Sequence, residues 1–352
     1  MKANPFKSFV PFVCTFDITK QLLSKLDEFG SGPLEQALRD VEQHDPTGSS
    51  WNTMHVADVA EWAFAYVATN VVVMAVQLNE RVLPSRVRDE LVSEKAAAHE
   101  DSVGRKPNKK EYRQLRDEAE HELLGKAFIK RTKTMVTFYG KHVIVWTSSL
   151  KRANAVLCTL VLTLSNNCGI ELQIKHSQGE ENPNGSIAEL SNFPQWTTEG
   201  SLSGAMRALL TDESKEVPAG GFVAGMSFAF KNVETKERIT FKDVEPATAE
   251  VWEIAKDDDV TVVKMEIHRK GQDGETDLTF NLSDKHLFSG LKFPNGSALD
   301  EEADDASFAT GAYLMARTAT DLLKGIGGLT ALSLNRDEEP EDSDDTGDEE
   351  DY

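Results

Sequence analysis

Two pairs of oppositely charged residues have the composition of a metal-dependent nuclease site. Glu171 and Lys175 are four residues apart, which places both on one face of a strand, and Glu266 lies two residues after Lys264. Nuclease sites surround divalent metal ions with carboxylates and place a lysine nearby that steadies the attacking water or the phosphate. Both spacings are also common on the surface strands of charged β proteins. A Mg²⁺-dependent DNA exonuclease is therefore an alternative, and we assign no catalytic residue and no metal site.

Signatures of other enzyme classes are missing from the sequence. It has no phosphate-binding G-x-x-x-x-G-K-[ST] loop, no H-E-x-x-H zinc motif and no G-x-S-x-G nucleophile turn. Cys14, Cys158 and Cys168 lack the spacing of a metal site or a disulfide framework, and are typical of buried thiols in a reducing cytoplasm. The sequence thus predicts a protein that is not an enzyme and needs no cofactor.

Basic residues are concentrated between Arg105 and Arg152, where 13 Lys or Arg accompany 5 Asp or Glu. They form two clusters, which are Lys106, Lys109, Lys110 and Arg113, and then Lys130, Arg131 and Lys133. A protein that binds phosphates without reading sequence needs many such cations on one surface, because its affinity comes from released counterions. We interpret both clusters as candidate DNA-binding residues. The alternative is a solvated helical arm with scattered surface charges.

The formal net charge of −21 conflicts with a nucleic-acid ligand until its distribution is considered. Residues 337–352 contain 11 acidic residues and no Lys or Arg, so a few residues supply much of the negative charge. This stretch has no aliphatic residue to bury, and we expect residues 336–352 to form a disordered acidic tail. Another hypothesis follows from the acidity, namely a surface that imitates DNA and binds a basic partner protein.

The elements that position the basic clusters are predicted from hydrophobic periodicity and from Gly and Pro positions. A strand is expected over residues 8–17 and a helix over 18–42. Charged helices are expected over 85–100 and 109–128, because Pro84 suits a first helical turn and the segment from Gly104 to Asn108 interrupts the pattern. Together these two helices predict a hairpin that projects from a sheet.

Further strands and helices are expected on both sides of this hairpin. The strands are 134–139, 142–147, 220–230, 238–241, 260–268 and 276–282, and the helices are 150–165 and 308–326, the second ended by Gly327 and Gly328. We interpret the apolar block 59–78 as a buried hairpin or a helix-to-strand element, with a membrane span as the alternative. The order of elements predicts an α+β fold with hairpin-connected antiparallel sheets and segregated helices.

Four regions follow from this order. Residues 1–84 and 129–180 are expected to form a central sheet region, and residues 85–128 the helical hairpin. Residues 181–335 are expected to form the remaining α+β region with a C-terminal helix, and residues 336–352 the tail.

In order and context, several segments resemble the bacterial recombination-associated protein family RdgC. The resemblance is densest from Arg81 to Val161, where Val82-Leu83-Pro84-Ser85 introduces the charged hairpin and Lys126-Ala127-Phe128 follows it. Weaker matches occur at Gln195-Trp196, from Lys231-Asn232 to Ile239, at Val263–His268 leading into Leu291-Lys292-Phe293, and from Leu314 to Gly328. The resemblance covers most of residues 8–329, and none of its motifs is catalytic.

This resemblance implies a ring-forming homodimer with a positively charged hole. Members of the family encircle duplex DNA, bind it without sequence preference and restrain strand exchange by RecA. The implied partners are double-stranded DNA, a second copy of the chain and a RecA-type recombinase, in the cytoplasm at the nucleoid and away from membranes.

Individual positions carry over from the family in the same way. Lys231 and Asn232 match a polar pair that faces DNA, although the family has a glutamine at the second position. Phe128 matches an aromatic residue at the tip contact that closes the ring, and the hairpin 85–128 matches a gate-like finger. The chain departs from the pattern in its length, its acidity and its acidic tail, which would fit a diverged or virus-encoded member.

Overall fold

The computed structural model describes residues 5–14, 16–29, 53–56, 71–168, 170, 190–191, 201–211, 221–246, 248–293 and 305–336. The helices are α1 (Ile18–Phe29), α3 (Ser85–Val103), α4 (Lys109–Leu124), α5 (Leu150–Cys168), α6 (Ser201–Thr211), α7 (Ala249–Lys256) and α8 (Asp305–Arg336), with a 3-10 turn at Pro5–Lys7. The strands are β1 (Ser8–Cys14), β2 (Thr53–Val56), β3 (Val71–Val82), β4 (Phe128–Tyr139), β5 (His142–Trp146), β6 (Leu190–Ser191), β7 (Phe222–Asn232), β8 (Arg238–Phe241), β9 (Val260–Lys270), β10 (Thr276–Ser283) and β11 (Phe288–Lys292).

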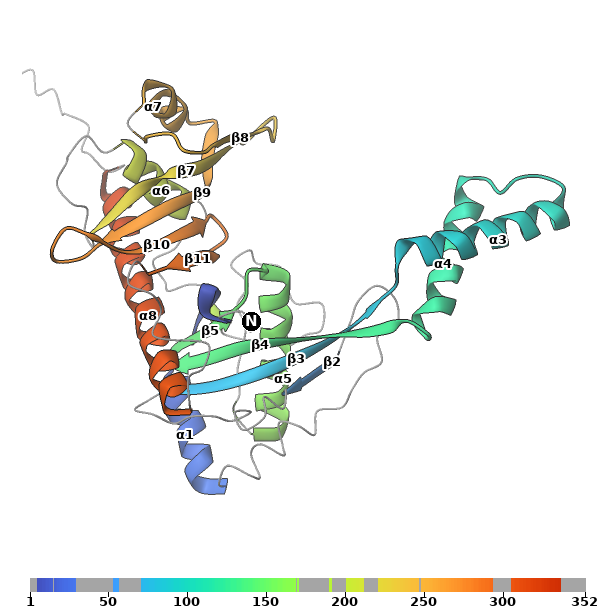
Figure 1. Ribbon diagram of the computed structural model, residues 1–352, viewed down its shortest axis with the longest axis horizontal. Coiled ribbons are helices and arrows are strands. Elements are labelled where there is room, and N and C mark those ends of the chain that lie inside the picture. Colours follow the sequence, from blue (N-terminus) through green and yellow to red (C-terminus); the bar gives the residue numbers. More distant parts are fainter. Residues whose placement is uncertain are drawn as a thin grey trace, which may run out of the picture.

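The strands form one antiparallel path in the order β2-β3-β4-β5-β1-β11-β10-β9-β7-β8, with β6 attached to β1 (Figure 1). β1 joins two halves of this sheet, because Val10–Val13 pair with β5 whereas Ser8 and Phe9 pair with β11. We call β2–β5 the first half and β7–β11 the second half. The expected α+β class is confirmed, with a large antiparallel sheet.

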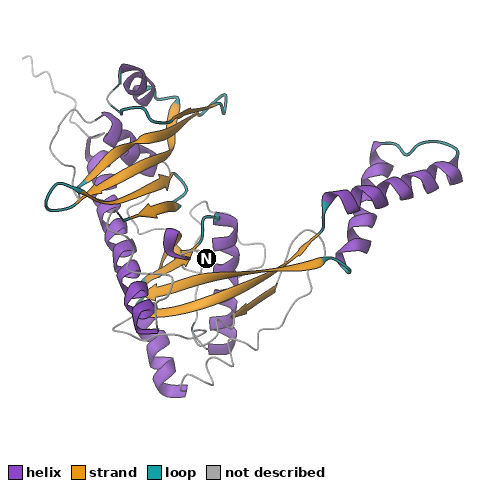
Figure 2. Cartoon of the chain, in the orientation of Figure 1, coloured by secondary structure: helices purple, strands orange, loops and turns teal. Residues whose placement is uncertain are grey.

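The helices lie outside the sheet and pack against parts of its faces (Figure 2). On one face of the first half, residues such as Val72 and Phe138 pack with Ile18 of α1 and Leu157 of α5. A second core is formed by residues from the other face of the first half and from one face of the second half, which we call its inner face. Residues of α6, α7 and α8 pack in the same core. Burial of these alternating strand residues drives the fold, because removing apolar surface from water is the main stabilising effect.

Helix α8 connects both halves of the sheet. Tyr313 in its N-terminal part packs edge to face on Tyr139 of β4, with ring centroids 6.1 Å apart. Gly325 in its C-terminal part lies directly against the ring of Phe222 in β7. The expected helix end at Gly327-Gly328 was wrong, since α8 continues to Arg336. Packing of the helix outweighs the local tendency of glycine to end it.

A long two-stranded ribbon carries the helical hairpin away from the sheet. β3 and β4 pair from Val71 with Tyr139 to Val82 with Phe128, and α3 and α4 follow where the ribbon ends (Figure 1). β4 therefore begins at Phe128, not at residue 134, and α4 ends at Leu124, not at residue 128. The segment from Lys130 to Lys133 is polar and lacks the apolar pattern of a strand. It is nevertheless part of β4, because it pairs with β3.

The apolar block 59–78 is described only from Val71, where it is strand β3. Among the helices of the described ranges, none combines the length and apolar character needed to cross a bilayer. Residues 30–42 of the expected first helix, residues 59–70 and the tail 337–352 lie outside the described residues.

Candidate nucleic-acid interface

The first predicted basic cluster lies at the free end of the helical hairpin, between α3 and α4 (Figure 1). Its side chains are all exposed, and they are Lys106, Lys109, Lys110 and Arg113. Gly104 ends α3 with φ of 74°, and its N–H donates to the Glu100 carbonyl over 2.8 Å. This left-handed conformation favours glycine, and it turns the chain toward α4.

Glu111 holds this turn in one conformation. Its carboxylate accepts two hydrogen bonds from the Arg105 guanidinium, at 2.7 and 2.8 Å, and one from the Asn108 N–H at 2.7 Å. The Asn108 side chain accepts from the N–H groups of Lys110 and Glu111, which completes a capping box. The hydrogen bonds from Arg105 and then from Asn108 lower the pKa of Glu111 to about 2. The turn therefore presents its lysines from a fixed backbone at neutral pH.

The base of the hairpin is attached to the ribbon by Arg81 of β3. Its guanidinium donates to the carbonyl oxygens of Leu124 and Gly125, at 2.9 and 3.1 Å, where α4 ends. A cation at this position complements both the free carbonyls and the helix dipole. Between the helices, Lys95 and Glu122 form an ion pair at 3.1 Å. These contacts fix the direction in which the hairpin leaves the sheet.

The second predicted basic cluster lies on β4 and is divided between two faces of the ribbon. Lys130 and Lys133 are exposed, and Arg131 lies between them on the strand. Successive strand residues alternate between faces, so Lys133 shares the face of Met135 and Lys130 that of Val136. Met135 belongs to the core that contains α8, whereas Val136 packs with α5. The strand thus offers cations on both sides rather than one continuous patch.

Phe128 is the first residue of β4, with 83% of its surface exposed. Val82, its partner across the ribbon, is 40% exposed. Among the described residues, Phe128 is not packed between a helix and the sheet, which was the alternative to a subunit contact. The residue lies at the base of the helical hairpin and not at its tip, so the expected position was wrong. The subunit contact itself stays a prediction.

The outer face of the second half, away from α6 and α8, carries a third set of cations. Along β9, Lys264, Glu266 and His268 alternate with the buried Met265 and Ile267. Directly opposite residues of antiparallel strands lie on the same face. Three more cations therefore lie on this face. Lys231 of β7 is paired with Arg238 of β8. Lys292 of β11 is paired with Thr279 of β10, which in turn is paired with His268 of β9.

We call Lys231, Arg238, Lys264 and Lys292 the outer-face cations; all four are exposed. Glu266 lies among them, and its carboxylate is 3.2 Å from the His268 ring. None of the four forms an ion pair with a described residue, whereas Arg269 of β9 is paired with Asp277 at 2.9 Å. Four strands thus contribute one available cation each to a face that no described helix covers.

Lys231 was predicted from the family resemblance, whereas Arg238, Lys264 and Lys292 were not. The alternation of Lys264, Glu266 and His268 is visible in the sequence, but the pairing that brings Arg238 and Lys292 beside them is not. Asn232 follows Lys231 and has a local role, because its side-chain oxygen accepts from the N–H groups of Glu234 and Thr235 at 2.9 and 2.8 Å. Its predicted contact with DNA is untested.

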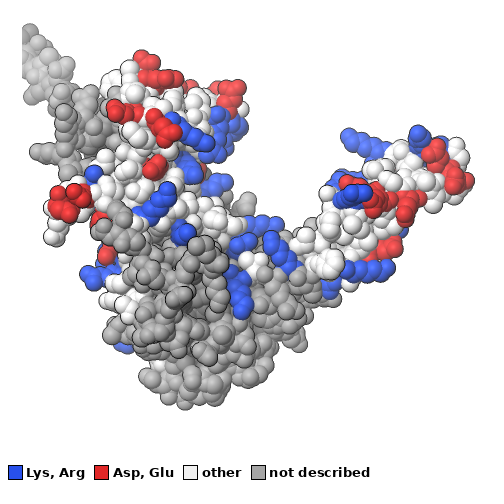
Figure 3. Space-filling model, viewed as in Figure 1, with Lys and Arg blue, Asp and Glu red and all other residues white. Residues whose placement is uncertain are grey.

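The two signs of charge are separated over the molecular surface. Figure 3 shows Lys and Arg along much of the concave side between the second half and the helical hairpin. Asp and Glu gather toward the outer ends of the molecule in the same view. Basic residues thus line part of the concave side in this view, in spite of the net charge of −21.

The residues proposed for the nuclease alternative do not come together in one described site. Glu171 and Lys175 lie outside the described residues. Glu266 and Lys264 share the outer face, and Glu266 is engaged with His268. Within the described ranges, no three His, Cys, Asp or Glu side chains are grouped closely enough to hold a metal ion.

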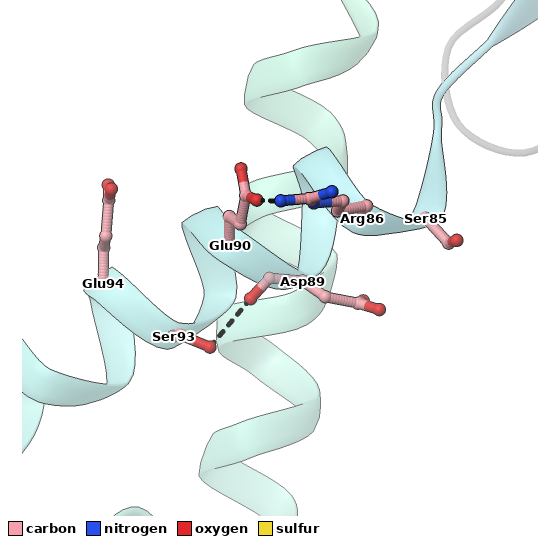
Figure 4. Close-up of a pocket in the computed structure, with 6 residues that line it drawn as sticks. All are labelled: Ser85, Arg86, Asp89, Glu90, Ser93 and Glu94. Carbon is pink, nitrogen blue, oxygen red and sulfur yellow. Dashed lines mark hydrogen bonds and ion pairs between the residues drawn. The ribbon is translucent and has the colours of Figure 1, made fainter.

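A shallow hollow of about 580 Å³ lies beside α3 (Figure 4). Its lining comes from one side of this helix alone: Ser85, Arg86, Asp89, Glu90, Ser93 and Glu94. Arg86 pairs with Glu90 at 3.0 Å, and the Ser93 hydroxyl donates to the Asp89 carbonyl at 2.9 Å. These contacts are those of a solvated helix, and they leave no convergent set of groups for catalysis.

Comparison with known proteins gives a match to one family and to individual relatives. Residues 9–189 match the family described as "Putative exonuclease, RdgC", a segment that includes the ribbon and the helical hairpin and ends before β7. The Recombination-associated protein RdgC of Proteus mirabilis (strain HI4320) is 27% identical over 213 residues, 60% of this chain and 66% of the relative. The protein of the same name from Xanthomonas campestris pv. campestris (strain B100) is 35% identical over 80 residues, 22% of this chain and 26% of the relative.

The matches thus cover just under two thirds of one relative and about a quarter of the other. The family match covers more than half of this chain and includes its most distinctive element, the helical hairpin on its ribbon. The chain belongs to the RdgC family.

Proposed function

We propose that this chain binds double-stranded DNA without reading its sequence, and that two copies close a ring around the duplex. The observation that carries the proposal is the set of outer-face cations, one from each of four strands, on a face that no described helix covers, in a chain with net charge −21. Sequence-independent affinity needs clustered cations more than base-reading groups. The exposed lysines of the hairpin tip, and those of β4 that share a face with the concave side, add further cations for a polyanion.

The biological role that we propose is restraint of RecA-type recombination. Relatives of this chain are named recombination-associated proteins. A ring on duplex DNA acts by occupying it, so its effect on strand exchange requires no catalytic group. The exposed Phe128 and Val82 supply an apolar surface for the contact between copies, because exposed aromatic residues of this kind are enriched in interfaces.

Binding to linear and covalently closed duplexes of equal length and sequence tests the ring directly. A closed ring cannot slide off a circle, so complexes on circular DNA should survive a wash at high salt that removes the protein from linear DNA. Phe128→Ala should abolish this difference. Equal survival on both topologies with the unchanged protein would contradict encirclement while leaving DNA binding intact.

An exonuclease is the second candidate, favoured by the description of the matching family. The same linear duplex, labelled at one end and incubated with Mg²⁺, distinguishes the two functions. We expect the label to stay in full-length DNA. Progressive loss that depends on protein and Mg²⁺, and that persists after mutation of unrelated surface lysines, would favour the exonuclease.

A further inference from the structure

The outer face of the second half is open to a polyanion that comes from the chain itself. The second half packs on α6, α7 and α8 with its inner face, and its outer face carries the four cations without a described ion pair. Asp284, in the turn after β10, lies close enough to Lys231 and Arg238 for both cations to act on its pKa, although burial outweighs them and raises it. The cations are thus available to a larger anionic partner.

The sequence supplies such a partner directly after α8. Residues 337–352 contain 11 carboxylates in 16 positions and no basic residue. In duplex DNA one negative charge occurs about every 1.7 Å along the helix axis. Successive residues of an extended chain are about 3.3–3.6 Å apart, so this segment carries about one negative charge per 5 Å, about a third of the density of duplex DNA.

The position of α8 brings this segment to the second half of the sheet. Gly325 is in contact with Phe222 at the start of β7, and Ile326 is buried in the core of the same half. The C-terminal end of α8 therefore lies beside α6 and the second half, away from the helical hairpin (Figure 1). A 16-residue chain spans at most about 55 Å, and the five strands of the second half are together about 20–25 Å wide.

Charge also distinguishes the surfaces of the second half. The end that carries α7 is acidic, with exposed Glu250, Glu253, Asp257 and Asp258. An acidic segment is repelled there and attracted by the outer face. The hairpin tip is basic as well, but it lies at the far end of the ribbon from α8 (Figure 1).

We propose that residues 337–352 dock on the outer face of the second half, against Lys231, Arg238, Lys264 and Lys292, and so occupy the surface that DNA requires. Docking depends only on the charges of the chain, whereas the competition with DNA rests on the proposed function. A tethered ligand acts at millimolar effective concentration, which compensates for weak individual ion pairs. DNA then binds when its longer array of charges displaces the tail.

The direct test compares the full chain with a full-length variant in which every Asp of residues 337–352 is Asn and every Glu is Gln. Lysine reactivity toward an amine-acylating reagent is measured by mass spectrometry at about 50 mM salt, where screening is weak. Lys231, Lys264 and Lys292 should react several-fold more slowly in the unchanged chain. Lys20, exposed near the start of α1 on the first half of the sheet, serves as the internal control and should react equally in both proteins.

A second arm measures the affinity of both proteins for one short duplex. Neutralising the tail should tighten binding about tenfold or more at about 50 mM salt, and the difference should shrink at about 300 mM. Equal reactivity of the three lysines in the two proteins overturns docking, whatever the DNA result. Protection of these lysines in a chain that does not bind DNA supports docking and overturns the proposed function instead.

Discussion

At the scale of single residues, Phe128 is an aromatic side chain that the protomer does not use for its own stability. It is 83% exposed and faces Val82 across the end of the ribbon. Loss of an aromatic residue at the centre of an interface costs about 2 kcal/mol or more, which corresponds to about a 30-fold weaker dimer.

Phe128→Ala should therefore raise the dissociation constant of the dimer, measured by light scattering over a dilution series, and leave the midpoint of thermal unfolding of the monomer unchanged. Tyr112→Ala, which removes a 47% exposed aromatic side chain from the hairpin tip, is the matched control and should leave the dimer unaffected. An unchanged dissociation constant with a lowered unfolding midpoint would assign Phe128 to the fold instead.

Glu111 gives a second prediction, on the pH dependence of the hairpin tip. Its pKa is lowered from 4.5 to about 2, first by Arg105 and then by the Asn108 N–H. A lowered pKa stabilises the folded tip above pH 4.5, and this contribution is lost as the pH falls from 4.5 toward 2. Protection factors of the backbone amides from Lys110 to Tyr112, measured by hydrogen exchange, should decrease over this window.

Glu111→Gln should produce the same loss of protection at neutral pH. Glu118→Gln, an exposed position on the same helix without a described ion pair, should not. Equal protection in both variants would mean that the capping box and Arg105 do not hold the turn.

At the scale of elements, α8 determines how the two halves of the sheet are held together. A Cβ atom at Gly325 would lie 2.3 Å from Cε2 of the buried Phe222 ring, so a substitution must displace a core side chain. Gly325→Ala should destabilise the protein by about 1–3 kcal/mol, as overpacking of cores does. Gly125→Ala meets no atom within 4 Å at helical dihedrals and should be neutral or slightly stabilising. Urea unfolding of both variants measures this difference, and equal midpoints would contradict the contact.

The sequence predicts elements well where the pattern is local. Pro84 and Gly104 mark the ends of α3, and the alternation in Val260–Lys270 marks β9. It predicts the ends of elements poorly where contacts with a partner strand or helix determine them. β4 starts six residues earlier than expected because β3 pairs with its polar part, and α8 continues past Gly327-Gly328 after Leu322, Leu323 and Ile326, which are buried in the core.

The candidate site shows the same division. Lys231 and the basic clusters can be found in the sequence as residue types. Their separation into a hairpin tip, two faces of β4 and an outer sheet face depends on strand register, and so does the addition of Arg238, Lys264 and Lys292. Register is set by long-range pairing and by bulges such as the one between Ala229 and Phe230, which no local pattern reveals.

At the scale of the whole molecule, the account depends on the distribution of charge and not on its sum. A chain with net charge −21 can bind a polyanion only if its acidic residues are kept away from a basic surface. The outer-face cations on the second half and the acidic residues around α7 show this separation within one half of the sheet. Docking of the tail makes the separation adjustable by salt and by DNA itself.

The measurement that tests the central claim is the salt dependence of duplex binding from about 50 to 200 mM. The logarithm of affinity should fall linearly with the logarithm of salt concentration, by about 0.9 per phosphate contacted, and Lys231→Ala with Lys264→Ala should reduce this slope by about two. The control Lys20→Ala, on helix α1 of the first half, should leave the slope unchanged. An equal slope in the double variant and in the control, or an affinity that does not depend on salt, would contradict an electrostatic DNA interface on the outer face of this sheet.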